Sequence, residues 1–185
     1  MSLRLSGGRR LQSPQGFTAR PTPARVRQAV MNMLAAELPG CRWLDLCSGS
    51  GVMACEALQR GAARVVAVEQ DRRNAAVARA NLQAVADGLG GRDVVVRQSE
   101  VLRWLHAGSE GSGEEPFDLI YADPPYGAGL YGPLAETVRL GNWLSPSGEL
   151  LLECGSAAVP GLPQGWELID QRRYGTTTVL RLQQG

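Results

Sequence analysis

The sequence predicts an α/β fold in which a mostly parallel, doubly wound sheet ends in a C-terminal antiparallel hairpin. Short apolar runs alternate with stretches of helical periodicity between residues 43 and 154, which indicates parallel strands joined by helical crossovers. The last two apolar stretches are instead joined directly at Tyr174-Gly175, as is typical of an antiparallel hairpin. At 185 residues the chain is long enough to bury a core and short enough for one main domain.

The elements follow from these patterns in chain order. Thr22-Pro23 is interpreted as an N-cap followed by proline at the first helical position, and Pro39-Gly40 as the end of that helix. The segment 108–115 holds three glycines and three acidic residues and is predicted to be a solvated loop. We therefore expect helices at 22–38, 52–60, 72–86, 101–106 and 130–144, and strands at 43–47, 64–69, 94–97, 117–122, 148–154, 166–173 and 176–182.

Charge is distributed unevenly along the chain. The first 36 residues hold six arginines and no acidic residue, whereas the rest holds 13 basic and 18 acidic residues. A basic segment on a mildly acidic body predicts contact with phosphate, and a solvated tail is the alternative. We therefore divide the chain into an arginine-rich N-terminal arm and helix at 1–38, expected to contact nucleic acid, and a main domain at 39–185.

Other composition features exclude several classes. No apolar run approaches the ~18 to 20 residues that span a bilayer, so a cytoplasmic protein without membrane contact is expected. The four cysteines form no CxxC pair and His106 is the only histidine, so we predict no metal site and no imidazole catalysis. The cysteines are interpreted as small buried hydrophobic residues, and His106 as a surface residue at a helix end. A monomer is expected.

A glycine-containing loop follows the first predicted strand. The run Leu44 to Gly51 ends in Ser48-Gly49-Ser50-Gly51, where glycine lets the backbone approach a ligand beside a helix N-terminus. Glu69 ends the second strand, 20 residues beyond Gly49, where a carboxylate can accept hydrogen bonds from ribose hydroxyls. This pattern predicts an adenosine-containing cofactor.

Two cofactors fit the loop. Gly49 to Ala54 also matches the G-x-G-x-x-A dinucleotide fingerprint. Asp45, inside the first strand, favours S-adenosyl-L-methionine because a carboxylate suits a cationic amino acid moiety and would repel a pyrophosphate. The chain is also short for a dinucleotide domain plus a substrate domain. After the third strand, Glu100 can contact adenine or simply belong to a helix start capped by Ser99. The predicted cofactor residues are Asp45, Ser48, Gly49, Ser50, Gly51, Glu69, Gln70, Glu100 and Val101.

The tetrapeptide Asp123-Pro124-Pro125-Tyr126 follows the fourth strand. Its prolines lack N–H groups and fix φ, so the loop is stiff and its carbonyls are available as acceptors. One carboxylate and one carbonyl can hold both hydrogens of a planar amine and stabilise the charge that develops on its nitrogen during methyl transfer. Tyr126 can stack on a base that is unpaired or flipped. A strand stop with a turn is the structural alternative.

These residues together resemble the bacterial 16S rRNA (guanine-N2)-methyltransferases of the RsmD type, which have a Rossmann-like class I methyltransferase fold. The resemblance covers nearly the whole chain, and its most specific part is the pairing of Arg20-Pro21-Thr22 with Arg25-Val26-Arg27. The other matching stretches are Ser6 to Leu11, Met31 to Leu34, Leu44 to Gly51, Asp71, Asn81, Phe117-Asp118, Asp123 to Tyr126 and Tyr174 to Thr177.

The resemblance implies methylation of a guanine N2 in small-subunit rRNA, free or in an assembling 30S particle. It implies RNA contacts at Arg9, Arg10, Arg20, Thr22 and Arg25. Tyr126 stands where the family commonly has phenylalanine, and Glu100 replaces a usual aspartate. The arm is also a few residues shorter after Gly8. The residues alone leave two other functions open: adenine-N6 methylation of DNA or RNA, and a non-catalytic RNA-binding assembly factor.

Overall fold

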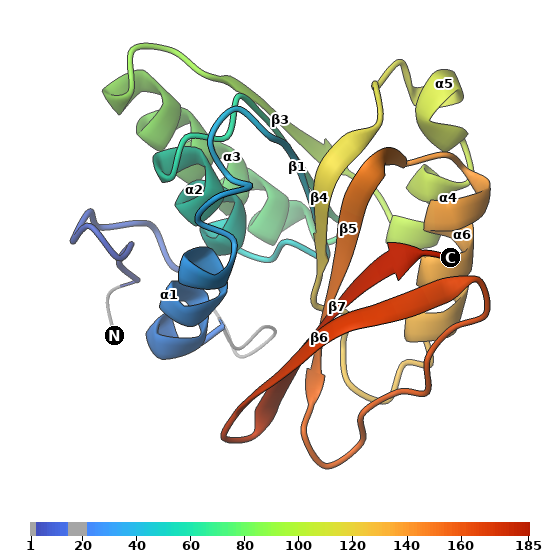
Figure 1. Ribbon diagram of the computed structural model, residues 1–185. Coiled ribbons are helices and arrows are strands. Elements are labelled where there is room, and N and C mark those ends of the chain that lie inside the picture. Colours follow the sequence, from blue (N-terminus) through green and yellow to red (C-terminus); the bar gives the residue numbers. More distant parts are fainter. Residues whose placement is uncertain (1–2, 15–21) are drawn as a thin grey trace. The chain divides into compact units, whose positions relative to one another are not determined.

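The computed structural model describes residues 3–14 and 22–185, so the predicted RNA contact Arg20 lies outside the described residues. The chain divides into two compact units, Met1–Ser99 and Glu100–Gly185 (Figure 1). Within the described residues, no helix combines the length and the apolar character needed to cross a membrane.

The first unit is built on three parallel strands in the order β3-β2-β1. The strands β1 and β2 are buried along nearly their whole length, as expected of parallel strands with apolar runs. Helices α2 and α3 contact both the strands and each other, and α1 contacts α2. The elements are α1 Ala24–Met33, β1 Arg42–Leu46, α2 Val52–Gln59, β2 Arg64–Glu69, α3 Arg72–Gly88 and β3 Asp93–Gln98.

The second unit has four strands in the order β4-β5-β7-β6. Strands β4 and β5 are parallel, and β7 pairs antiparallel with both β5 and β6. Its core contains Trp143, whose indole N–H donates to the Leu105 carbonyl at 2.9 Å. The elements are α4 Val101–Leu105, α5 Gly108–Ser112, β4 Phe117–Ala122, α6 Tyr131–Leu140, β5 Leu144–Gly155, β6 Trp166–Tyr174 and β7 Thr177–Gln184.

The expected alternation of strands and helices and the C-terminal hairpin are confirmed. The first helix is shorter than predicted at both ends. Pro23, rather than Thr22, is the N-cap, and Pro23 itself makes no capping hydrogen bond through its side chain. Leu34 leaves helical geometry, yet Leu34 and Leu38 remain fully buried in the turns that follow. The apolar spacing therefore marked core residues beyond the helix end.

Two further predictions in the second unit are wrong. The predicted loop at 108–115 contains the short helix α5, held by a bond from Ser109 N–H to the Gly141 carbonyl at 3.0 Å. This helix depends on backbone hydrogen bonds and has no apolar periodicity. The helix predicted at 130–144 ends at Leu140, because the chain turns at Asn142, where φ is +52°.

The N-terminal segment 3–12 forms a tight hairpin that packs on the first unit. Arg4 pairs with Arg10 in an antiparallel bridge, and Leu3, Leu5 and Leu11 are buried. Strand pairing in this segment is confined to that one bridge. The hairpin is attached to α2, since both the N–H and the hydroxyl of Ser6 donate to the Glu56 carboxylate, at 2.9 and 3.0 Å.

Candidate active site and RNA-binding residues

The glycine loop of the first unit turns through left-handed backbone conformations. Cys47, Gly49 and Gly51 have φ of 59°, 55° and 75°. The turn is closed by a bond from Gly51 N–H to the Ser48 carbonyl at 2.8 Å. A Cβ on Gly51 would lie 3.2 Å from the Cα of Ala78 on α3, so both conformation and space require glycine there.

Gly49 provides a matched control for Gly51. Both have positive φ, but a Cβ on Gly49 would meet nothing within 4 Å. We expect Gly49→Ala to cost about 1–2 kcal/mol of unfolding free energy through backbone strain alone. Gly51→Ala should cost about 1–3 kcal/mol more, because α3 must move away from the loop. Urea unfolding of the two variants measures the difference; equal losses would show that the contact with α3 is unimportant.

The two predicted carboxylates are buried and bind the loop backbone. Asp45 is 2% exposed, and one of its oxygens accepts the Ala54 N–H at 3.1 Å. Glu69 is 8% exposed and accepts the N–H groups of Gly49 and Asp71 through its two oxygens, at 2.7 and 2.9 Å. Both groups therefore shape the loop, and each Glu69 oxygen has a second lone pair that can accept a hydrogen bond from a ligand. Gln70, also predicted, is exposed.

Sequence reasoning missed the role of Asn81 on α3. This side chain is 2% exposed and donates to the carbonyls of Ser50 and Gln12, both at 3.0 Å. It also accepts the N–H of Gln12 at 2.8 Å. Asn81 thus joins the glycine loop, α3 and the N-terminal segment. Only the family resemblance signalled this position, since one amide in an alanine-rich helix has no spacing pattern.

One polar atom of the loop is buried without a partner. Among the described residues, the hydroxyl of Ser48 accepts and donates no hydrogen bond. Buried hydroxyls are normally satisfied, so an unsatisfied one beside two carboxylates is consistent with a place for a polar ligand. The loop therefore fits a cofactor that presents both hydrogen-bond donors and acceptors.

Glu100 is itself the N-cap of α4, so the cap predicted at Ser99 is wrong by one residue. The two oxygens of Glu100 accept the N–H groups of Leu102 and Arg103 at 2.9 and 2.8 Å. Glutamate is not among the preferred N-cap residues, which is why the sequence pattern indicated serine. Val101 is buried at 6% exposure. The structure therefore gives Glu100 a local structural role, and its adenine contact stays a prediction.

The tetrapeptide follows β4 in the second unit. Asp123 is half-buried and Pro124 is buried, whereas Pro125 is exposed and Tyr126 is 61% exposed. A Cβ on Gly155, at the end of β5, would lie 3.8 Å from the Tyr126 ring, so the ring covers this glycine. The Tyr126 hydroxyl is hydrogen-bonded to the side chain of Thr177, and burial, followed by the charge of Asp123, raises its pKa. The tetrapeptide thus presents an anchored aromatic ring beside a carboxylate.

A buried polar cluster lies behind Tyr126 and was not predicted. Glu153 on β5 is 2% exposed and accepts a hydrogen bond from the Tyr121 hydroxyl. The Tyr131 hydroxyl donates to the Glu153 carbonyl at 3.1 Å. Burial raises the pKa of the neighbouring Cys154 thiol to about 11, with Glu153 and Asp123 adding to the shift. Cys154 is therefore protonated at neutral pH, which argues against a nucleophilic role.

The predicted RNA contacts differ in exposure. Arg9, Arg10 and Arg25 are exposed. Arg9 also donates to the Ala84 carbonyl of α3 at 2.9 Å, which holds its side chain against the first unit. Thr22 is buried at 6% exposure, and its carbonyl accepts a bond from Arg27. The arginines, rather than Thr22, are therefore presented to a ligand.

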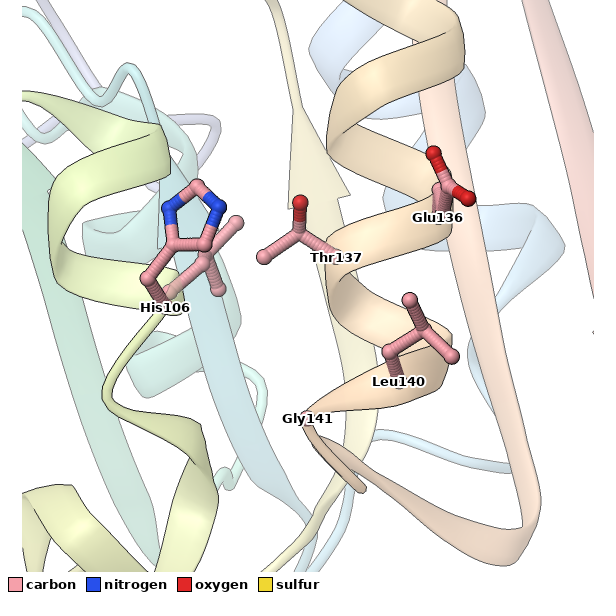
Figure 2. Close-up of a pocket in the computed structure, with 6 residues that line it drawn as sticks. His106, Glu136, Thr137, Leu140 and Gly141 are labelled. Carbon is pink, nitrogen blue, oxygen red and sulfur yellow. The ribbon is translucent and has the colours of Figure 1, made fainter.

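A pocket of about 350 Å³ in the second unit contains none of the predicted site residues. Figure 2 shows the Thr137 side chain of α6 directed toward the His106 ring at the end of α4, while Glu136 and Leu140 project from other parts of α6. His106 is the exposed C-cap of α4, as predicted, and its ring is bonded to the Leu102 carbonyl. Across the described parts of the chain, no group of three potential metal ligands is found.

Comparison with known structures defines the class of protein. A structure described as putative methyltransferase yhhF from Escherichia coli matches 100% of this chain and 98% of its own, with a TM-score of 0.80 and 26% identity. SMU.776, a putative methyltransferase complexed with SAH, is 17% identical with a TM-score of 0.69, covers 84% of this chain and 48% of its own, and supports the fold alone. The fold is that of the Rossmann-like class I methyltransferases.

The sequence comparisons identify the family. The family described as conserved hypothetical protein 95 matches residues 5–183. Ribosomal RNA small subunit methyltransferase D of Escherichia coli (strain K12) is 31% identical over 172 residues, which are 91% of this chain and 81% of that protein. The chain belongs to this family, and the resemblance to the RsmD type is confirmed.

Proposed function

We propose that this chain methylates the exocyclic N2 of a guanine in small-subunit rRNA, with S-adenosyl-L-methionine as methyl donor. The observation that carries the proposal is the Asp123 to Tyr126 loop, with its exposed ring beside a carboxylate, in a member of this family. The relative at 31% identity is named a ribosomal RNA small subunit methyltransferase, which supports RNA as substrate.

The glycine loop would hold the cofactor. Asp45 would serve its amino acid moiety and Glu69 its ribose, while the unpartnered Ser48 hydroxyl offers one further hydrogen bond. Gly49 leaves no side chain between the loop backbone and the ligand, because a Cβ there would meet no protein atom within 4 Å, whereas the missing side chain of Gly51 lets α3 pack closely on the loop. When bound, the cofactor supplies an electrophilic methyl group on a sulfonium. Both carboxylates are already fixed by backbone N–H groups, so little reorganisation is required on binding.

The tetrapeptide would hold the target base. The Asp123 carboxylate and the Pro124 carbonyl would accept the two hydrogens of the amine, whose lone pair is otherwise delocalised into the ring. These acceptors stabilise the positive charge that develops on the nitrogen during methyl transfer. Tyr126 would stack on the base, and its bond to Thr177 would keep the ring in one orientation. Pro125, between these groups, contributes stiffness.

The N-terminal segment 1–38 would contact the RNA backbone, in free rRNA or in an assembling 30S particle. Arg9, Arg10 and Arg25 are exposed, and the hairpin at 3–12 attaches the first two to the first unit. Guanidinium groups bind phosphate oxygens in a bidentate manner, and such contacts release counterions. The segment is therefore proposed to bind the RNA backbone through charge, without preference for a base sequence.

Arg25 can be tested against Arg92, an exposed arginine outside the arm. We expect Arg25→Ala to weaken binding to a small-subunit rRNA transcript about fivefold. The slope of the logarithm of the binding constant against the logarithm of the salt concentration should also fall, by the amount that one phosphate contact contributes. Arg92→Ala should change binding less than about twofold. Filter binding over a series of salt concentrations measures both quantities. Equal effects of the two variants would contradict a specific role of the arm.

The reaction is tested with purified chain, isotopically labelled S-adenosyl-L-methionine, and either small-subunit rRNA or duplex DNA. After digestion to nucleosides, the label is expected in N2-methylguanosine from RNA only. Label in N6-methyladenine would replace the proposal by an adenine methyltransferase, and RNA binding without any label would favour an assembly factor.

A further inference from the structure

We propose that one face of the β6–β7 hairpin is a second RNA-binding surface, on which Tyr174 and Arg172 hold the nucleotide next to the target base. This inference rests on the proposed function, because it extends the site around Tyr126. Figure 1 shows the hairpin, in orange-red to red, with its turn at the end of the second unit where β5 ends.

Strand register places Tyr174 in line with the tetrapeptide. Gly155 of β5 pairs with Thr177 of β7, and Thr177 pairs with Tyr174 of β6. Residues directly opposite one another in antiparallel strands project to the same face. Tyr126 covers Gly155 and is bonded to the Thr177 side chain, so this row of residues lies on the face that Tyr126 occupies.

The spacing suits neighbouring nucleotides. Adjacent strands lie about 4.8 Å apart, so the backbone of Tyr174 is about 10 Å from that of Gly155 beneath the Tyr126 ring. Tyr174 is half-buried and keeps part of its ring exposed. A second aromatic ring at this distance offers a stacking surface to a base adjacent to the one on Tyr126, and stacking of this kind tolerates any base.

Arg172 supplies the charge on the same face. It lies two residues before Tyr174 on β6, and side chains at this spacing project to one side of a strand. Its side chain is 59% exposed and forms an ion pair with Asp170, with 2.7 Å between Nε and the carboxylate oxygen. A guanidinium has five N–H donors, so this contact orients the group and leaves donors for a phosphate.

Arg173 makes the matched control because it carries the same charge on the opposite face of the strand. Its Nε donates to the carbonyl of Gly175 in the hairpin turn at 3.1 Å. Both arginines are exposed, so neither substitution should prevent folding. A general increase in affinity from positive charge would depend on both residues equally, whereas the proposed surface depends on Arg172.

The test is binding of the full chain to a small-subunit rRNA transcript as a function of salt. We expect Arg172→Ala to weaken binding about fivefold and to lower the salt slope by about 0.7, as for one phosphate contact with a single strand. Arg173→Ala should weaken binding less than about twofold, and Tyr174→Ala should weaken binding with an unchanged slope.

Equal losses for the Arg172 and Arg173 variants, or no loss for the Arg172 and Tyr174 variants, would overturn the inference. Thermal unfolding of each variant shows whether a loss of binding reflects a loss of structure. Failure of the proposed function itself is recognised separately, because the unsubstituted chain would then not methylate the transcript, whether or not it binds the RNA.

Discussion

Replacement of Asp123 by alanine is expected to lower methyl transfer to rRNA by about 100- to 1,000-fold. Its carboxylate is proposed to accept a hydrogen bond from the amine and to stabilise the charge that develops on the nitrogen. The effect should appear mainly in kcat, since the interaction strengthens as the charge develops. RNA binding should change less than about twofold, because stacking and phosphate contacts come from other residues.

Two variants sharpen this prediction. Asp123→Asn keeps the shape of the side chain and removes the charge, so it should retain little more activity than Asp123→Ala. Glu136→Ala removes an exposed carboxylate on α6 and should leave the rate unchanged. Single-turnover assays with saturating RNA measure the chemical step directly. Full activity of either Asp123 variant would show that this carboxylate takes no part in the mechanism.

Substitution of Arg27 by methionine should destabilise the chain by about 3–5 kcal/mol, as expected when one partner of a buried ion pair is lost. Arg27 is 4% exposed, and its Nε lies 3.4 Å from the carboxylate of Glu56, which is 1% exposed. Arg27 also donates to the carbonyls of Thr22 and Arg4, so it joins α1, α2 and the N-terminal hairpin. Without the guanidinium, the Glu56 charge remains buried beside the two donors of Ser6 and has lost its ion-pair partner.

Arg25→Ala is the matched control, because Arg25 lies two residues earlier on α1 and is exposed. This variant should change the unfolding free energy by less than about 0.5 kcal/mol. The double variant Arg27→Met, Glu56→Gln should recover part of the loss, since no uncompensated charge remains. Urea unfolding of the variants gives these energies. A loss below about 1 kcal/mol for Arg27→Met would show that the ion pair is not structural.

The sequence predicted the parts of the fold that depend on local patterns. The limits of β2 and β4 agree with the predicted 64–69 and 117–122, because both are apolar runs bounded by polar or turn residues. The existence of helix α5 and the early ends of α1 and α6 were not predictable in this way. They depend on turns, on backbone hydrogen bonds and on one positive φ at Asn142, which leave no apolar period in the sequence.

Charge counting treated the arginines of the arm as equivalent, and the structure separates them. Arg27 is buried in an ion pair, whereas Arg10 and Arg25 are exposed. The partner of Arg27 is Glu56, 29 residues away on another helix, so no local pattern could indicate the pair. Part of the positive charge in the arm therefore has a structural role.

In the candidate site, too, local patterns identified contiguous motifs but not contacts between distant segments. The glycine loop and the tetrapeptide are contiguous motifs and were found from sequence. Asn81 and Glu153 act through contacts with segments far away in the chain, so their roles became visible only in the structure. Each is buried and polar, which is the property that distinguishes such positions once burial is known.

The proposed function is tested most directly by nucleoside mass spectrometry of small-subunit rRNA from cells with and without the gene for this chain. We expect the amount of N2-methylguanosine to fall when the gene is absent. It should be restored by a copy that encodes the unsubstituted chain, and not by one that encodes the Asp123→Ala variant. An undiminished amount of N2-methylguanosine in cells without the gene would contradict the proposed function.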